Sequence, residues 1–273
     1  MSLKYSHLRK RVLSVLVAIP IVTTAVHWSP LSYFLLFLVI VTLTMLEFYQ
    51  LASAGGMRPN KFLGIGGGMV TYTLVFMQAS GHMPGNYLYL FCPMVALIYL
   101  TELYRQGASP FTNIAYTLLG IVYVSGPFSL LHIIAFSQGA YSHEIVMGIL
   151  LILWANDTGA YLIGSSIGKH RLFKRISPKK SWEGALGGAT LALVVSYIIA
   201  NYFSSIGLAT WLGMGSIIAV AGTYGDLVES MLKRSLKIKD SGKLIPGHGG
   251  FLDRFDSFLL AIPFIVAFIR LLY

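Results

Sequence analysis

Long apolar runs separated by short polar segments dominate this chain. Nine runs are long enough to cross a membrane or nearly so, and they lie at about 12–28, 31–51, 62–80, 87–104, 111–136, 145–165, 183–204, 207–231 and 257–273. A bilayer core about 30 Å thick needs roughly 20 apolar residues in a helix. The run at 62–80 is the weakest, because four glycines between 64 and 68 dilute its hydrophobicity. The pattern predicts an all-α, polytopic integral membrane protein with about nine transmembrane helices.

The composition supports a lipid environment and narrows the class of partner. Of the 273 residues, 56% are hydrophobic and 11% are charged, whereas a soluble domain carries roughly 25% charged residues. The formal net charge is +10. In a membrane protein this excess favours anionic lipid headgroups and an anionic substrate, and no nucleic acid. Cys92 is the one cysteine of the chain, so no disulfide can form within it.

The positions of Lys and Arg predict an orientation. With nine spans and the N-terminus in the cytoplasm, 19 of the 20 Lys and Arg residues fall on the cytoplasmic side, and the exception is Arg270. This one-sidedness follows the positive-inside rule. We therefore expect a multi-pass protein of a bacterial inner membrane, with its active site on the cytoplasmic face.

No internal repeat interrupts the chain, and residues 1–273 are expected to form a single membrane domain. Residues 1–150 are interpreted as N-terminal helices that provide a scaffold and dimer or lipid contacts. Residues 151–273 contain the two longest polar loops, both predicted to be cytoplasmic, and are interpreted as the catalytic part.

Carboxylates within apolar helices are the first candidates for a site, because a charge inside a membrane is costly and usually functional. Asp157 and Asp226 lie in the sixth and eighth predicted helices. For Asp157, a hydrogen bond to a neighbouring helix is the structural alternative. Glu229 shares a helix face with Asp226, and it could instead form an ion pair with Lys233 that simply ends the span.

Two carboxylates earlier in the chain are interpreted structurally. Glu47 and Glu102 lie near the predicted cytoplasmic ends of the second and fourth helices. We expect both to anchor their helices at the membrane interface, with Glu102 paired to Arg105 three residues later.

The segment 237–257, KIKDSGKLIPGHGGFLDRFDS, concentrates polar chemistry near the end of the chain. Asp253 and Asp256 are three residues apart where a helix should begin, and such a carboxylate pair can bind Mg²⁺. Acidic residues also suit a helix N-terminus electrostatically, which is the alternative. The preceding glycines, Gly249 and Gly250 among them, can direct backbone N–H groups at a phosphate.

Further residues of this segment favour an anionic ligand. Lys239, Lys243 and Arg254 flank the glycine-rich loop. His248 could be a general base, a metal ligand or a phosphate contact, and contact with a phosphate or nucleotide is the favoured interpretation.

The other polar loop reads GKHRLFKRISPKKSWEG. In its simplest interpretation it is a solvated basic loop that sets the topology. Ser177-Pro178 and Ser181-x-Glu183 also resemble the start of a helix, with Pro at a first helical position and Ser as a cap. A helix beginning there would fix Lys179 and Lys180 at the membrane surface, where they could meet an anionic headgroup.

Together these features favour phosphoryl or nucleotidyl transfer to a substrate that is at least partly lipid. Such reactions depend mainly on positioning and charge neutralisation. Basic side chains, a predicted Mg²⁺ site and an anion-binding loop would all lie at one membrane face.

The motifs resemble those of a known family. The runs are Ser230-x-x-Lys233-Arg234, Lys239-Asp240-Ser241-Gly242 and Pro246-Gly247-His248-Gly249-Gly250-x-x-Asp253-Arg254-x-Asp256. They are similar to the signature of the phosphatidate cytidylyltransferases, also called CDP-diacylglycerol synthases. Gly225-Asp226 and Ser177-Pro178-Lys179-x-Ser181-x-Glu183-Gly184 resemble further family patterns. The match spans roughly residues 154–256, and the first 150 residues match only in being hydrophobic.

The resemblance implies a reaction of CTP with phosphatidate that gives CDP-diacylglycerol and pyrophosphate. It also implies Mg²⁺, with K⁺ as a possible second cation, and a homodimer in the membrane lipid. It assigns metal binding to Asp226, Asp253 and Asp256. The predicted catalytic residues are Asp226, Asp253, Asp256 and Lys233. The predicted substrate-binding residues are Arg234, Lys239, Asp240, Ser241, His248, Gly249, Gly250, Arg254, Ser177, Lys179, Ser181, Glu183 and Asp157.

Within this set, Lys233, Arg234, Lys239 and Arg254 would neutralise the triphosphate, and Lys179 and Ser181 would hold phosphatidate. The phosphatidate phosphate has a second pKa of about 6 and is already largely ionised at neutral pH. A general base is therefore not required.

Two other functions compete with this interpretation. A CTP-dependent lipid kinase, of the polyprenol or phytol kinase type, would use the same nucleotide and metal but release CDP instead of pyrophosphate. An ion-coupled transporter could use Asp157 and Asp226 as a relay. The transporter is disfavoured because no inverted repeat is visible and the polar residues lie in loops.

Overall fold

The computed structural model describes residues 16–238, 242 and 249–272. The predicted site residues Lys239, Asp240, Ser241 and His248, and the flanking Lys243, lie outside this range. The chain divides into two compact units. Unit 1 contains residues 1–132 and 235–254, and unit 2 contains residues 133–234 and 255–273.

Helices of membrane-spanning length account for most of the described chain. Eight are long and apolar enough to cross a bilayer, namely Pro30–Ala54, Lys61–Ala79, Gly85–Leu103, Pro110–Ala135, His143–Ile167, Trp182–Tyr202, Leu208–Ser235 and Leu252–Leu272. A shorter apolar helix, Leu16–Trp28, precedes them and coincides with the first predicted span. The all-α, polytopic prediction is confirmed.

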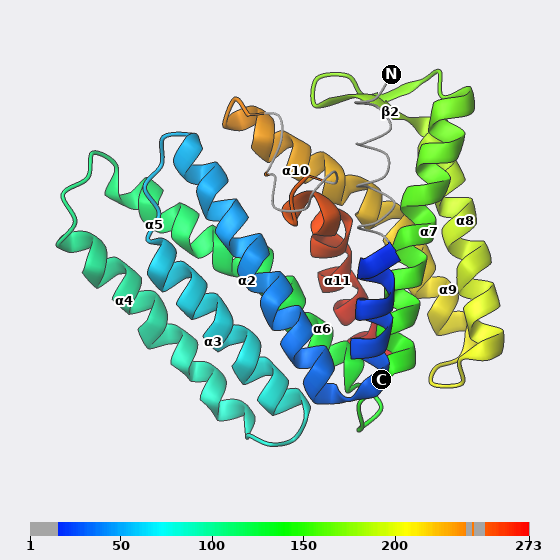
Figure 1. Ribbon diagram of the computed structural model, residues 1–273, viewed down its shortest axis with the longest axis horizontal. Helices are drawn as coiled ribbons and strands as arrows, with labels where there is room; N and C mark the ends of the chain where they lie inside the picture. The colour runs from blue at the N-terminus through cyan, green and yellow to red at the C-terminus, as the bar shows by residue number, and fades with distance from the viewer. Residues whose placement is uncertain (1–15, 239–241, 243–248, 273) are drawn as a thin grey trace. The chain divides into compact units, whose positions relative to one another are not determined.

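Unit 1 is a helical bundle (Figure 1). Its elements are α2 (Pro30–Ala54), α3 (Lys61–Ala79), the 3₁₀ turn η1 (Gly85–Leu90), α4 (Phe91–Leu103), α5 (Pro110–Leu119), the π-helical η2 (Gly120–Ser125) and most of α6 (Gly126–Ala135). Helix α2 begins with a capping box between Ser29 and Ser32, with Pro30 at the first helical position. These features satisfy backbone N–H groups that have no acceptor within a helix.

The glycine-rich run in α3 permits close packing. A β-carbon on Gly64 or Gly120 would overlap the ring of Tyr49 in α2. The Tyr49 hydroxyl passes between these positions and donates a hydrogen bond to the Thr117 carbonyl at 2.7 Å. Small residues at such positions let membrane helices approach closely. Of the four glycines that weaken the hydropathy signal at 62–80, Gly64, Gly67 and Gly68 therefore serve the packing of unit 1.

Unit 2 is built around a tightly packed helix pair. Its elements are α7 (His143–Ile167), the strands β1 (Arg171–Phe173) and β2 (Ser177–Ser181), α8 (Trp182–Tyr202), α9 (Leu208–Ile217), the π-helical η3 (Ile218–Gly222), α10 (Thr223–Ser235) and most of α11 (Leu252–Leu272). Helices α7 and α8 lie side by side, as Figure 1 shows. A β-carbon on Gly188 would lie 2.7 Å from the Asn156 carbonyl oxygen, so glycine is required at this crossing.

An antiparallel hairpin joins α7 to α8 and corrects one prediction. Ser177 and Pro178 lie in strand β2, paired with β1, and do not start a helix. The helix starts at Trp182, with Ser181 as its cap: the Ser181 hydroxyl accepts a hydrogen bond from Gly184 N at 3.2 Å. The sequence has possible helix starts at Ser177 and, four residues later, at Ser181. The helix begins after Ser181, which is nearer the apolar run of α8. Lys179 and Lys180 therefore project from a strand.

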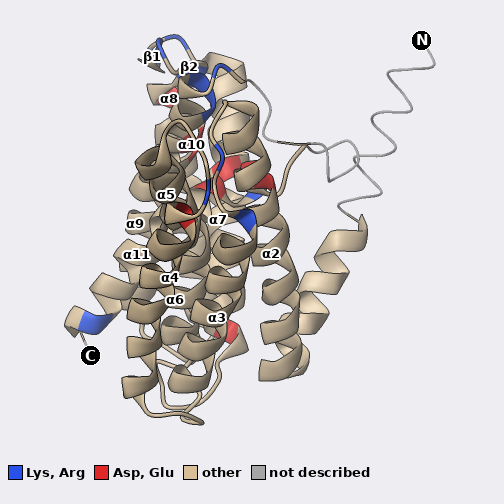
Figure 2. Cartoon of the chain, turned by 90° about the vertical axis from the view of Figure 1, so that its left-hand side faces the viewer, with Lys and Arg blue, Asp and Glu red and all other residues tan. Residues whose placement is uncertain are grey.

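The basic residues of unit 2 gather at the hairpin end. Figure 2 shows Lys and Arg on the β1–β2 segment. The hairpin follows the C-terminal end of α7 and precedes α8. Arg270 lies in the last turn of α11, which is the other end of that helix from its acidic start. Within unit 2 this distribution agrees with the charge asymmetry expected from the sequence.

Candidate functional site

The site begins with a close crossing of α10 and α11 in unit 2. A β-carbon on Gly225 would lie 2.9 Å from the Ser257 α-carbon, so this position accepts only glycine without a shift of the backbone. The π-helical turn η3 directly precedes α10, and such turns are frequent at functional sites. The crossing brings the residue after Gly225, Asp226, alongside Asp256 of α11.

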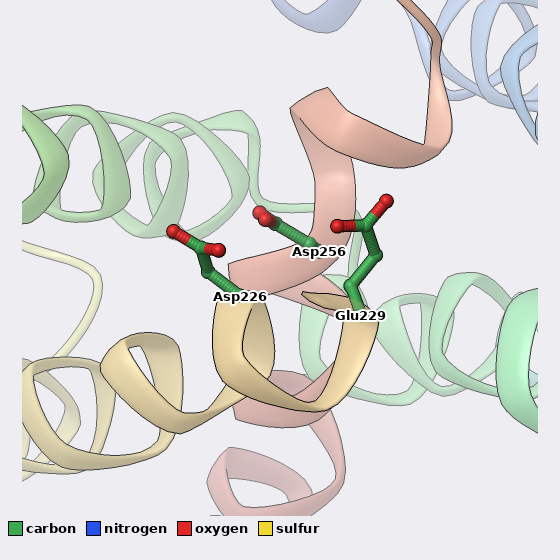
Figure 3. Close-up of side chains that lie close together, drawn as sticks. All are labelled: Asp226, Glu229 and Asp256. Atoms are coloured by element: carbon green, nitrogen blue, oxygen red, sulfur yellow. The ribbon is translucent and has the colours of Figure 1, made fainter. Parts of the chain in front are cut away.

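Three carboxylates converge at this crossing. Asp226, Glu229 and Asp256 each offer an oxygen, and these oxygens all lie within 4.8 Å of one another. Figure 3 shows the three side chains, with Asp256 from α11 between the two residues of α10. Asp256 and Glu229 are 8% and 1% exposed, whereas the Asp226 side chain is 40% exposed. The cluster is therefore buried on one side and open at Asp226.

Lysines flank the cluster on two sides. Lys180 Nζ, from strand β2, lies 2.8 Å from Asp226 Oδ2 and donates a hydrogen bond to the Thr223 carbonyl at 3.0 Å. Lys233 pairs with Glu229 four residues earlier on α10. Among the described residues, three carboxylates thus pair with two ammonium groups. Like charges at this separation repel one another strongly, and the excess negative charge favours a further cation.

The donor set fits a hard divalent cation. Mg²⁺ and Ca²⁺ prefer carboxylate oxygens, and Mg²⁺ usually keeps several water or phosphate ligands besides one or two carboxylates. Asp226, Glu229 and Asp256 supply such oxygens, and the exposed side at Asp226 leaves room for ligands from solvent or substrate. The fit therefore rests on the chemistry of the donors and on their spacing.

Asp157 extends the polar region along α7. Its Oδ1 accepts a hydrogen bond from the Ser257 hydroxyl at 3.4 Å. Ser257 directly follows Asp256, and its backbone N–H donates to Asp256 Oδ1 at 2.6 Å. The hydrogen bond to a neighbouring helix that was one alternative for Asp157 is thus present, and it ends next to the carboxylate cluster.

The comparisons with known proteins give the family. A model described as "Cytidylyltransferase family" matches residues 9–272. A phosphatidate cytidylyltransferase of Staphylococcus aureus is 34% identical over 213 residues, which are 76% of this chain and 80% of that protein. Another, of Haemophilus influenzae, is 33% identical and covers 94% of this chain and 96% of that protein. This chain belongs to the cytidylyltransferase family. The resemblance found in the sequence motifs is confirmed.

The candidate site of this cytidylyltransferase-family chain contains a carboxylate that the sequence interpretation did not assign to it. Glu229 was left between a functional role and an ion pair with Lys233, and it has both the ion pair and a place in the cluster. The signal was its spacing of three residues from Asp226. Lys180 was not assigned to the site either, because its contact with Asp226 joins residues 46 positions apart in the sequence.

Asp253 lies in unit 1, in the first turn of α11. Its Oδ2 lies 3.4 Å from the Gly250 backbone N–H, which donates to it. Gly249 has φ of +85°, the left-handed region that favours glycine. The glycine-rich turn thus has the backbone conformation expected of it, and metal binding by Asp253 stays a prediction. Arg254, the next residue, is exposed.

The hairpin residues occupy two kinds of position. Ser181 is 4% exposed and caps α8, while Lys179 is exposed and its carbonyl accepts from Arg171 at 3.3 Å. The Glu183 carboxylate accepts from the backbone N–H of Lys169 and lies 2.6 Å from His170 Nδ1. Glu183 therefore ties the start of α8 to the end of α7.

A recess of about 640 Å³ lies where the hairpin meets the first turns of α8. It is lined by Lys169, His170, Arg171, Lys174, Trp182, Glu183 and Leu186. Trp182 and Leu186 are 54% and 66% exposed. Basic and apolar side chains together suit the boundary between lipid headgroups and acyl chains.

Proposed function

We propose that this chain transfers the cytidylyl group of CTP to phosphatidate, giving CDP-diacylglycerol and pyrophosphate. The observation that carries the proposal is the cluster of Asp226, Glu229 and Asp256 next to Lys180, in a chain of the cytidylyltransferase family. The family membership supports the nucleotide chemistry. The names of the Staphylococcus and Haemophilus relatives support phosphatidate as the acceptor.

The reaction exchanges one phosphorus–oxygen bond for another. An oxygen of the phosphatidate phosphate attacks the α-phosphorus of CTP, the bond between the α-phosphorus and the bridging oxygen breaks, and pyrophosphate leaves with that oxygen. The attacking phosphate is largely ionised at neutral pH, since its second pKa is about 6. The protein therefore has no proton to remove, and its task is to hold two anions together in line.

The carboxylates of Asp226, Glu229 and Asp256 would bind Mg²⁺. When bound, this ion would neutralise negative charge on the triphosphate and orient it. Lys180 and Lys233 stand beside two of these carboxylates and could each turn toward a phosphate once the carboxylate charge is satisfied by the metal. Arg234 and Arg254 are exposed and remain our candidates for further contacts with the triphosphate.

The lipid would approach from the hairpin side. Lys179 is exposed on β2, and the recess beside the hairpin combines Lys169, Arg171 and Lys174 with exposed Trp182 and Leu186. Ser181 was expected to hold phosphatidate, and its capping of α8 supports an indirect contribution, through the position of the hairpin.

The finer topology belongs to this proposal. Nine spans with a cytoplasmic N-terminus would place the hairpin and the end of α10 in the cytoplasm, where CTP is available. The eight long helices and the additional helix Leu16–Trp28 support that count. A homodimer and a second cation, K⁺, remain predictions from the resemblance.

Identification of the products tests the proposed function. The purified protein is incubated with CTP, phosphatidate and Mg²⁺, with release of pyrophosphate measured and the lipid product identified by mass spectrometry. We expect pyrophosphate and a CDP-lipid in equal amounts. Release of CDP with a phosphorylated lipid alcohol, when polyprenol or phytol is supplied, would instead establish the lipid kinase.

A substitution tests the residue that the structure leaves outside the cluster. We expect Asp253→Asn to abolish pyrophosphate release while the protein still inserts and purifies normally. An active Asp253→Asn protein would remove Asp253 from the metal site and leave Glu229 as the third ligand.

A further inference from the structure

Helix α2 buries a carboxylate in the middle of an apolar environment in unit 1. Glu47 has no exposed surface, and its neighbours Met45 and Phe48 are also buried. Its expected role as an interfacial anchor stays a prediction, since burial inside the protein does not define depth in a membrane. A buried carboxylate costs free energy unless hydrogen bonds compensate it. The buried Glu47 carboxylate therefore requires a hydrogen-bond donor that compensates its loss of hydration.

One partner within the described residues is the start of α11. Glu47 Oε2 accepts a hydrogen bond of 2.8 Å from the backbone N–H of Leu252, the first residue of that helix. The first N–H groups of a helix have no acceptor within it, and a side chain just before the helix usually provides one. The residue before Leu252 is Phe251, which has no side-chain acceptor. Glu47 thus caps α11 from a helix 205 residues away in the sequence.

The charge of Glu47 suits this place. The N-terminus of a helix carries partial positive charge, and an anion next to it is stabilising. A glutamine could accept the same hydrogen bond without the charge, and an apolar residue could do neither. The environment therefore distinguishes Glu from both replacements, which makes the role testable.

Glu47 also contacts the segment that precedes the glycine-rich loop. A β-carbon built on Gly242 would lie 2.6 Å from the Glu47 carboxyl carbon. Gly242 is the glycine of the Lys239-Asp240-Ser241-Gly242 motif. The Glu47 side chain therefore contacts both the end of this motif and the first residue of α11.

We propose that Glu47 is a positioning residue of the transferase site: it fixes the first turn of α11, which carries Asp253 and, one turn later, Asp256. This inference deepens the proposed function and rests on it. By this proposal the N-terminal region, interpreted from the sequence as a scaffold, helps to position the carboxylates of the site. A displacement of about 1 Å at a reacting centre can lower a rate about 100-fold.

Hydrogen exchange tests the contact without relying on activity. In the purified full-length protein, the backbone N–H groups of residues 250–256 should exchange faster in Glu47→Leu than in the wild type. Glu47→Gln should give intermediate exchange, because its amide oxygen can still accept. Thr44→Val is the matched control: Thr44 is equally buried on α2, and its hydroxyl bonds to Ile40 within the helix. It should leave exchange at 250–256 unchanged.

Kinetics and metal binding test the positioning role. We expect Glu47→Leu to lower kcat about 10–100-fold, as loss of an outer partner of a metal site does, with little change in KM for CTP. Binding of Mn²⁺ alone, followed by its paramagnetic resonance signal, should weaken in the same variant. Glu47→Gln should recover part of both, and Thr44→Val should match the wild type in both.

The outcomes separate the two proposals. If Glu47→Leu exchanges and binds Mn²⁺ like the wild type, the positioning role is wrong, whatever the wild-type protein synthesises. It is also wrong if Thr44→Val reproduces the losses of Glu47→Leu, since the cause would then be the packing of α2. If the wild type makes no CDP-lipid while Glu47→Leu still loses Mn²⁺, the proposed function fails and the role of Glu47 stands.

Discussion

Glu102 in unit 1 and Glu229 in unit 2 are both buried glutamates that pair with a cation three or four residues later in the chain, yet their surroundings differ. Glu102 accepts from Arg105 at 2.8 Å with one oxygen and from the Asn113 amide at 2.7 Å with the other. Glu229 pairs with Lys233 and also lies within 4.8 Å of carboxylate oxygens of Asp226 and Asp256.

The difference separates structural carboxylates from ligand-binding ones. Both oxygens of Glu102 are occupied by donors of the protein itself, so its charge is already compensated. Among the residues that the structure describes, the three carboxylates Asp226, Glu229 and Asp256 pair with two lysines, and this excess of negative charge favours a cation as a ligand. An ion pair between residues close in the sequence is compatible with either role, and the carboxylates on neighbouring helices decide between them.

Of the variants that test this comparison, Asp256→Asn should cause the largest loss of activity. It removes one negative charge from the cluster and keeps the shape of the side chain. We expect CDP-lipid formation to fall at least about 100-fold, because loss of even an outer partner of a metal site costs about 10–100-fold. Pyrophosphate release at saturating substrates measures it, with thermal unfolding as the check on folding. A rate close to that of the wild type would remove Asp256 from the metal site.

Glu229→Gln and Glu102→Gln form a matched pair for the comparison itself. We expect the first to lower kcat about 10–100-fold and to weaken binding of Mn²⁺, and the second to keep kcat within about twofold. Both variants remove one charge from a buried glutamate paired to a cation, so general destabilisation would affect them alike. Equal losses of kcat per folded molecule would show that the cluster gives Glu229 no special part.

Lys180→Met should act in the opposite direction on metal binding. Lys180 lies 2.8 Å from Asp226, and its removal leaves the cluster more negative. We expect Mn²⁺ to bind about fivefold more tightly, which corresponds to about 1 kcal/mol, a modest interaction between charges a few ångströms apart near solvent.

Lys179→Met is the control for Lys180→Met, because Lys179 is the exposed neighbour on the same strand. It should leave the affinity for Mn²⁺ unchanged. Weaker binding of Mn²⁺ to Lys180→Met would mean that Lys180 holds Asp226 in position for the metal and does not compete with it.

The sequence predicted the helices and part of this site, for identifiable reasons. Apolar runs of about 20 residues can do little except span a bilayer, so the spans were found even where glycines dilute them. Asp226 was found because carboxylates in apolar helices are unusual, and Asp256 because it forms a pair with Asp253 at a predicted helix start. The approach of Asp226 to Asp256 depends on the crossing at Gly225, and the resemblance to a known signature brought them together in the prediction.

The remainder depended on contacts between distant residues. Lys180 reaches Asp226 because Ser177-Pro178-Lys179 forms a strand, and the local signals there suggested a helix start. Glu47 was interpreted as an interfacial anchor near the end of a span, and local signals gave no hint that it also caps α11. In both cases the local sequence around a polar residue near an apolar run did not indicate its tertiary partner.

Arg105→Met should have the smallest effect and is the sharpest test of the structural role of Glu102. The Arg105 side chain is 37% exposed, and pairs that involve an exposed cation contribute about 0–1 kcal/mol. Asn113 still holds the other oxygen of Glu102, so we expect the free energy of unfolding to fall by less than about 1 kcal/mol, with the rate per folded molecule unchanged. Lys233→Met, the corresponding change beside Glu229, should instead lower the rate, because Lys233 faces the triphosphate in the proposed reaction. If the two variants lost activity equally, the distinction between Glu102, whose charge is compensated within the protein, and Glu229, which lies in a carboxylate cluster, would fail. Both ion pairs would then have the same role.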